Sequence, residues 1–163
     1  MDHLFATWRM DYITTPKYEG CIFCDFPSEN RDEERYILHR GRACFVILNL
    51  YPYNPGHLMV VPYRHTHLYE SLTDEECLDM NRLAARSIQV LKRAMAPEGF
   101  NMGMNLGKTA GAGMEEHLHL HVVPRWNGDN NFMPVVTDTR VVPEALDATF
   151  KKLKSSWLSF SVA

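Results

Sequence analysis

Three histidines stand at alternate positions of one short apolar stretch, at His117, His119 and His121. Side chains on a β-strand alternate between its two faces. A strand here would therefore present all three imidazoles on one face and the apolar residues between them on the other. Each imidazole has two ring nitrogens that need partners. A row of three is expected to bind a ligand or to do chemistry.

Three interpretations of this row compete. A chance polar face is disfavoured, because a covered strand packs apolar residues on both faces. The second is a zinc site that uses all three imidazoles. The third is nucleophilic catalysis by one ring, with the others orienting it and binding an anion. The third is favoured by Gly111-Ala112-Gly113 shortly before the row, because glycine permits donor-lined concavities that hold phosphate.

The seven residues from His117 to Val123 resemble the signature of the histidine triad (HIT) family at every position. The resemblance covers roughly residues 20–136, as the motifs show. It also takes in Asn49 to His57, Pro62 to His65 and Asn105. Two further segments resemble the branch that includes HIT-type diadenosine tetraphosphate phosphorylases and hydrolases, namely Trp8 to Tyr12 and Val123 to Trp126.

The resemblance implies a covalent route through a nucleotidyl-histidine. His119 would attack the α-phosphorus of a dinucleoside polyphosphate or a related nucleotide, with support from His121 and His57. The nucleotide would then pass to water or to another acceptor. The resemblance also implies a homodimer, and Mg²⁺ is expected to arrive with the substrate.

The same resemblance assigns Asn49 to the ribose hydroxyls and Asn105 to phosphate. The glycine loop adds the backbone N–H groups near Gly111 and Gly113 as phosphate donors. Trp126 is expected either at the substrate end of the surface or in the core, since tryptophan serves both roles. Many family members carry Gln or Ser where Gly113 stands. The choice between water and phosphate as acceptor therefore stays open.

Cys21 and Cys24 have the C-x-x-C spacing of half a zinc site. A redox pair is the alternative, but it would need a helix after the motif, and Pro27 disfavours a long helix there. In zinc-bearing HIT proteins and related uridylyltransferases the other two ligands correspond to His65 and His117. The resemblance thus implies a closed, structural Cys2His2 zinc site, with His67 as an alternative to His65.

Two other functions fit the same residues. One is a zinc metallohydrolase in which the three histidines are all ligands. The other is a nucleotide-binding module with little turnover.

The elements expected around these residues form an α+β fold, an antiparallel sheet covered by a helix. Strands are predicted over 43–48 and 57–62, which form a hairpin, and over 100–106 and 116–123. A further strand over 132–136 is predicted at the edge of the sheet. Apolar residues at helical spacing predict a helix over 74–96, which begins with a capping box of Thr73 and Glu76. A second helix is predicted over 143–157, an exposed loop over 25–35 and an arm over 1–20.

Composition bounds the remaining possibilities. The chain has 163 residues with 17 basic and 20 acidic side chains, a net charge of −3. We expect one domain over 1–163 and no broad basic surface for nucleic acid. No apolar run approaches the roughly 18 residues of a membrane span, and no signal peptide is recognisable. Four cysteines without an export signal favour a cytoplasmic protein without a disulfide framework.

Overall fold

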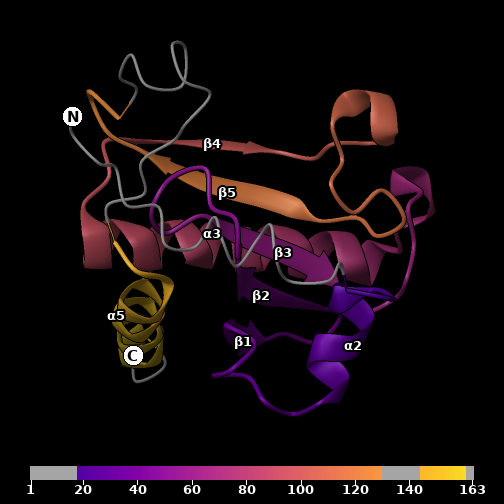
Figure 1. The fold of residues 1–163 in the computed structure, drawn as a ribbon, viewed down its shortest axis with the longest axis horizontal. Coiled ribbons are helices and arrows are strands. Elements are labelled where there is room, and N and C mark those ends of the chain that lie inside the picture. The colour runs from indigo at the N-terminus through magenta and orange to yellow at the C-terminus, as the bar shows by residue number, and fades with distance from the viewer. Residues whose placement is uncertain (1–17, 130–143, 161–163) are drawn as a thin grey trace, which may run out of the picture.

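The computed structural model describes residues 18–129 and 144–160 (Figure 1). Its centre is a five-stranded antiparallel sheet in the order β1-β2-β3-β5-β4. The strands are β1 (Ile37–Arg40), β2 (Cys44–Leu48), β3 (Leu58–Pro62), β4 (Gly99–Gly103) and β5 (Leu120–Arg125). The helices are α2 (Ile22–Ser28), α3 (Asp74–Met95) and α5 (Leu146–Ser159), with short 3₁₀ turns at Tyr69–Ser71 and Lys108–Ala110. The predicted α+β class and the predicted hairpin of β2 and β3 are confirmed.

The sheet separates two apolar clusters, because neighbouring residues of each strand face opposite sides. One set, which includes Val46 and Val60, packs with α3 and α5. The other set, which includes Phe45 and Val61, packs with α2. Every residue of β2 and β3 is buried, so both faces of these strands are covered. Helix α3, the predicted cover, therefore lies on one face of the sheet, and α2 lies on the other (Figure 1). His121 pairs with Met59, a residue of the cluster that includes α2, so its side chain is on the α2 face.

Helix α3 begins where the capping box predicts. The Thr73 side chain accepts a hydrogen bond from the Glu76 backbone, and the Glu76 side chain accepts one from the Thr73 backbone. The pair satisfies two backbone donors that the first helical turn leaves without partners. The helix ends at Met95, where Ala96 adopts the left-handed conformation.

Strand β5 is shifted relative to the predicted strand over 116–123. Residues 116–119 precede it, and the Leu118 backbone N–H bonds instead to the Thr66 carbonyl oxygen at 2.8 Å. The strand also continues through Pro124 to Arg125. Pro124 is tolerated because the pairing of β5 with β3 ends at Val122, so no partner there needs the missing N–H.

Three other expectations need adjustment. The predicted loop over 25–35 is partly wrong, since residues 25–28 belong to α2, a helix of 7 residues that contains Pro27. Strand β1 was not predicted. The C-terminal helix begins three residues later than the predicted 143–157 and ends two residues later. The predicted edge strand over 132–136 and most of the arm over 1–20 lie outside the described residues.

Within the described part of the chain, no helix is long and apolar enough to cross a membrane.

Two leucines on one helix test this packing. Leu153 of α5 is fully buried in the main cluster, whereas Leu158 is 58% exposed. We expect Leu153→Ala to lower the free energy of unfolding by about 2–5 kcal/mol, because it removes buried contacts and leaves a cavity. Leu158→Ala should change it by about 0.5 kcal/mol or less. Chemical denaturation of both variants measures the difference, and equal losses would contradict the placement of α5.

Candidate active site and metal centre

Four predicted metal ligands come together at the start of α2. The ligand atoms of Cys21, Cys24, His65 and His117 all lie within 4.8 Å of one another. Cys21 Sγ is 3.2 Å from His117 Nδ1, and Cys24 Sγ is 3.3 Å from His65 Nδ1. A tetrahedral zinc ion sets neighbouring sulfur and nitrogen ligands about 3.5 Å apart. The cluster could therefore hold a metal ion, and His67 is not part of it.

The ring of His117 is oriented from its far side. Its Nε2 lies 2.8 Å from the Pro62 carbonyl oxygen, which can only accept a hydrogen bond, so Nε2 carries the proton. The lone pair of Nδ1 then faces the two sulfurs. Such an outer partner is the usual means of orienting a metal-bound histidine. Burial raises the pKa of the Cys24 thiol to about 11, so metal binding there displaces a proton.

His119 is held by the backbone of the same segment. Its Nδ1 lies 2.9 Å from the carbonyl oxygen of His117, so Nδ1 donates and Nε2 keeps its lone pair. The ring is 6% exposed and packs on Phe23 at 5.1 Å between ring centres. Burial lowers the pKa of His119, and the bond to the His117 carbonyl opposes this in part. The ring is thus neutral and presents an unprotonated nitrogen.

His57 and His121 form a second hydrogen-bonded series. The Tyr53 backbone N–H donates to His57 Nδ1 at 3.1 Å, which places the proton of His57 on Nε2. That Nε2 lies 2.9 Å from His121 Nδ1, so the proton of neutral His121 is on its own Nε2. Burial lowers the pKa of His121 to about 4. Among the described residues its Nε2 has no hydrogen-bond partner, which makes it a buried donor ready for a ligand.

A cavity of about 450 Å³ lies beside His121 and is also lined by Tyr53, Asn105 and Arg125. The loop that carries Tyr53 is hydrogen-bonded to the end of β5. Buried Asn54 donates through Nδ2 to the Pro124 carbonyl oxygen at 2.9 Å and to Asp129 at 2.8 Å.

Asp129 forms a two-pronged ion pair with Arg125, whose Nε and Nη2 donate to the two Asp129 carboxylate oxygens at 2.6 and 2.8 Å. These bonds hold the pKa of Asp129 well below its usual range. The pair thereby fixes Asn54, and through the loop it fixes the Tyr53 N–H that sets the protonation of His57.

The predicted substrate residues are brought together only in part. Asn49 Nδ2 is 3.3 Å from His57 Nδ1, so Asn49 joins the histidine series. Asn105 Nδ2 is 3.4 Å from the Gly111 carbonyl oxygen and ties back the glycine loop, where Gly111 has φ +87°. Gly113 has open space around it, with no atom within 4 Å of the position of a Cβ. Trp126 lines a different cavity, of about 880 Å³, beside the end of α3.

Sequence reasoning missed several residues of the site. Phe23 packs on both His117 and His119, and its position between the two cysteines is the one signal for it. Tyr53 acts through its backbone, which no residue pattern reveals. Asn54 and Asp129 lie in turns, where polar residues are common.

Comparison with known proteins assigns the chain to a family. The sequence model of the HIT domain matches residues 30–128. AP-4-A phosphorylase of Mycobacterium tuberculosis is 48% identical over 166 residues, covering 96% of this chain and 85% of that protein. The bis(5'-nucleosyl)-tetraphosphatase [asymmetrical] of Schizosaccharomyces pombe is 29% identical, over 57% of this chain and 50% of that protein. The chain belongs to the HIT family.

Solved structures agree on the fold. A zinc-bound histidine triad protein of Mycobacterium smegmatis has a TM-score of 0.71 at 25% identity, covering 88% of this chain and 96% of the other. A uridylyltransferase structure has a TM-score of 0.67 at 18% identity, over 94% of this chain and 50% of that one, and so shares the fold.

Asp129→Asn tests whether the ion pair of Arg125 and Asp129 holds the Tyr53 loop in place. The control is Glu34→Gln, which removes the charge from an exposed ion pair with Arg31. A depressed pKa means that the Asp129 bonds stabilise the fold fully above the ordinary carboxyl pKa of about 3.9. This stabilisation declines as pH falls below that value and is lost as pH falls through the lower pKa of the folded state. We expect Asp129→Asn to lower the free energy of unfolding at pH 7, and the deficit to shrink below about pH 4. Glu34→Gln should have little effect. A deficit that does not vary with pH, measured by urea unfolding, would contradict this.

Proposed function

We propose that the protein transfers a nucleotide from a dinucleoside polyphosphate through a nucleotidyl-His119 intermediate. The observation that carries the proposal is the bond from His119 Nδ1 to the His117 carbonyl oxygen, which leaves Nε2 as an unprotonated nucleophile in a buried site. Nε2 forms a bond to the α-phosphorus while the bond from phosphorus to the bridging oxygen breaks. A polyphosphate leaving group is a weak base, so no strong general acid is required. Splitting the reaction into two steps lowers each barrier.

His121 supplies the electrostatic support in this proposal. Its buried Nε2–H would donate to a non-bridging oxygen of the α-phosphate, where negative charge develops. His57 and the Tyr53 N–H keep that proton in place from behind. Backbone donors near Gly111 and Gly113 and the side chain of Asn105 would contact the remaining phosphates. Asn49 would hold the ribose hydroxyls, and Trp126 would contact the far end of the substrate. Mg²⁺ would come with the polyphosphate rather than occupy a site of its own.

The acceptor of the second step is proposed to be orthophosphate. This rests on the 48% identity to a protein named AP-4-A phosphorylase over most of the chain. An oxygen of orthophosphate would attack the phosphorus and displace His119, which releases a nucleoside diphosphate. Water in the same place would release a nucleoside monophosphate.

The alternative of three zinc-bound triad histidines has less support. Among the described residues, the metal cluster contains His117 but neither His119 nor His121. Their Nδ1 atoms are engaged with the His117 carbonyl oxygen and with His57.

Intact-mass spectrometry tests the proposal, on protein that reacts briefly with diadenosine tetraphosphate and is then quenched without acid. Wild type should gain the mass of one AMP, because the nucleotide becomes bonded to His119. His119→Ala should show no adduct and lose turnover at least about 1,000-fold, the order expected when a covalent nucleophile is removed.

The control is His67→Ala, an exposed histidine outside the cluster, which should match wild type. Equal turnover in His119→Ala would overturn the covalent route. Tight nucleotide binding without product in wild type would indicate a binding module. Repeating the reaction with and without orthophosphate, and identifying ADP or AMP as product, decides the acceptor.

We further propose that Cys21, Cys24, His65 and His117 hold a structural zinc ion. The donor set and spacing fit the fourfold coordination that zinc prefers, and a relative of the same fold is described as zinc-bound. Four protein ligands leave no open position for substrate. When bound, the ion supplies a cross-link between α2, the segment after β3 and the segment before β5.

Replacement of one cysteine tests the zinc site. We expect one zinc ion per wild-type chain, and a weaker hold on it in Cys21→Ser because a thiolate ligand is lost. Cys77→Ser is the matched control, since Cys77 is a thiol outside the cluster. Elemental analysis of the purified proteins measures the content. Equal zinc in Cys21→Ser and wild type would contradict the assignment.

The exposed edge of the sheet and the free cysteines bear on assembly and location. Strand β4 ends the sheet with residues Asn101 to Gly103 exposed, Met102 being 47% exposed. We propose that this edge pairs with a second copy, which gives a homodimer of twice the chain mass in sedimentation. All four cysteines are free thiols, and on this ground we propose a cytoplasmic location. We propose no nucleic-acid partner because the net charge is −3, and no membrane partner.

A further inference from the structure

One of the four residues in the metal cluster, His65, has little structural support around its own side chain. His65 is exposed, whereas His117 is buried and the two cysteines are half-buried. The ring of His117 is oriented by the Pro62 carbonyl oxygen. His65 lies instead on the segment between β3 and α3 and contacts the cluster through Nδ1. An exposed ligand on a connecting segment needs another restraint if the cluster is to be formed before metal binds.

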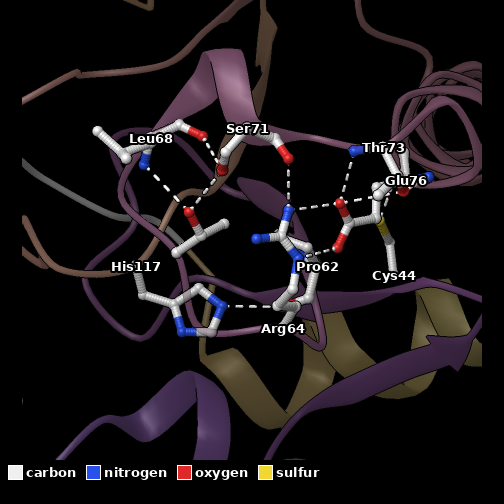
Figure 2. A network of polar contacts seen from close by, with 9 residues as sticks. Cys44, Pro62, Arg64, Leu68, Ser71, Thr73, Glu76 and His117 are labelled. Carbon is white, nitrogen blue, oxygen red and sulfur yellow. Dashed lines mark hydrogen bonds and ion pairs between the residues drawn. The ribbon is translucent and has the colours of Figure 1, made fainter.

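The residue before His65 is tightly fixed. Arg64 donates through Nε and Nη2 to the two carboxylate oxygens of Glu76, at 2.8 and 2.7 Å (Figure 2). The same Nη2 donates to the Ser71 carbonyl oxygen at 2.8 Å. The Glu76 side chain is 8% exposed and also accepts from the Thr73 backbone N–H. The capping box of α3 and the ion pair thus share one carboxylate, so Arg64 is anchored to the helix.

The residue after His65 is fixed as well. The carbonyl oxygen of Thr66 accepts from the Leu118 backbone N–H at 2.8 Å, next to the ligand His117. The Thr66 hydroxyl contacts the Ser71 hydroxyl at 3.0 Å and accepts from the Leu68 backbone N–H at 3.2 Å (Figure 2). His65 is therefore held between two anchored neighbours, and its ring centre lies 5.1 Å from that of His117.

We propose that Arg64 and Glu76 are positioning residues that hold His65 against Cys24 and so set how tightly the four-residue cluster retains its metal. The inference rests on the proposed metal site. The two side chains bond to each other, to Ser71 and to Thr73, and they act by restricting the backbone on which His65 stands. Freeing that segment lets the metal-free state occupy more conformations, which metal binding must then reverse. Loss of a group that bonds a metal ligand directly typically weakens metal binding about 10- to 100-fold, so a restraint that acts through the backbone should have an effect at or below the low end of that range.

The coupling is reciprocal, because linkage acts equally in both directions. Metal bound through His65 restricts Arg64 and thereby favours the first turn of α3. The ion pair should accordingly raise the unfolding temperature more in the metal-loaded protein than in the metal-free one.

Glu76→Gln is the sharpest variant, because glutamine also fits a capping box and removes only the charge that pairs with Arg64. Its matched control is Glu75→Gln, one residue away on the same helix, whose exposed carboxylate lies 3.7 Å from Arg42. Zinc affinity and zinc release are measured on the full chain by competition with a chromophoric chelator. We expect Glu76→Gln to bind zinc more weakly by up to about 10-fold, with faster release, and Glu75→Gln to match wild type.

Unfolding temperatures with zinc and with chelator separate positioning from simple stability. A merely structural role would lower both equally, whereas positioning reduces the difference between them. Arg64→Lys, which keeps the charge but lacks the two-pronged guanidinium, should lie between wild type and Glu76→Gln and serves if Glu76→Gln fails to fold. Wild type that binds no zinc would overturn the metal site itself. Equal zinc affinity in wild type, Glu76→Gln and Arg64→Lys would overturn this inference alone.

Discussion

The bond between the His119 ring and the His117 carbonyl oxygen is the constraint on which the site depends. It fixes the proton on Nδ1 and leaves Nε2 free for attack. The same residue, His117, turns its ring the other way, toward the cysteines and the Pro62 carbonyl oxygen. One residue therefore belongs to two structures, with its side chain in the Cys/His cluster and its backbone carbonyl against the ring of His119. Whatever holds the His117 ring also holds the carbonyl that orients His119.

The sheet makes this arrangement possible by keeping its two faces distinct. Helices α3 and α5 bury one face, so the core forms without using the histidines. On the other face, α2 brings the cysteines to His117 and places Phe23 against the rings. The rings are thus removed from water, which lowers the pKa of His119 and His121. A neutral ring keeps the lone pair that nucleophilic attack requires, and a neutral ring can still donate a hydrogen bond through its one N–H.

Sequence predicted the fold class and which four cysteine and histidine side chains come together, but not how the protons are arranged. Helix α3 was predictable because Thr73 and Glu76 form a local capping box. The four residues of the Cys/His cluster could be named from the family motifs, whose residue types are those that zinc prefers. By contrast, the protons of His57 and His121 depend on the backbone N–H of Tyr53, whose direction is set by a loop fastened through Asn54. Such contacts join residues far apart in the chain and leave no local pattern.

The arrangement of protons is also the feature to test most directly, since the proposed chemistry follows from it. Long-range ¹H–¹⁵N NMR of protein labelled at histidine distinguishes a proton on Nδ1 from one on Nε2. We expect neutral rings near pH 7, with the proton on Nδ1 in His119 and on Nε2 in His57 and His121. A proton on Nε2 of His119 in the metal-loaded, ligand-free protein would contradict the proposed chemistry, because the nitrogen assigned to attack phosphorus would then have no lone pair to give.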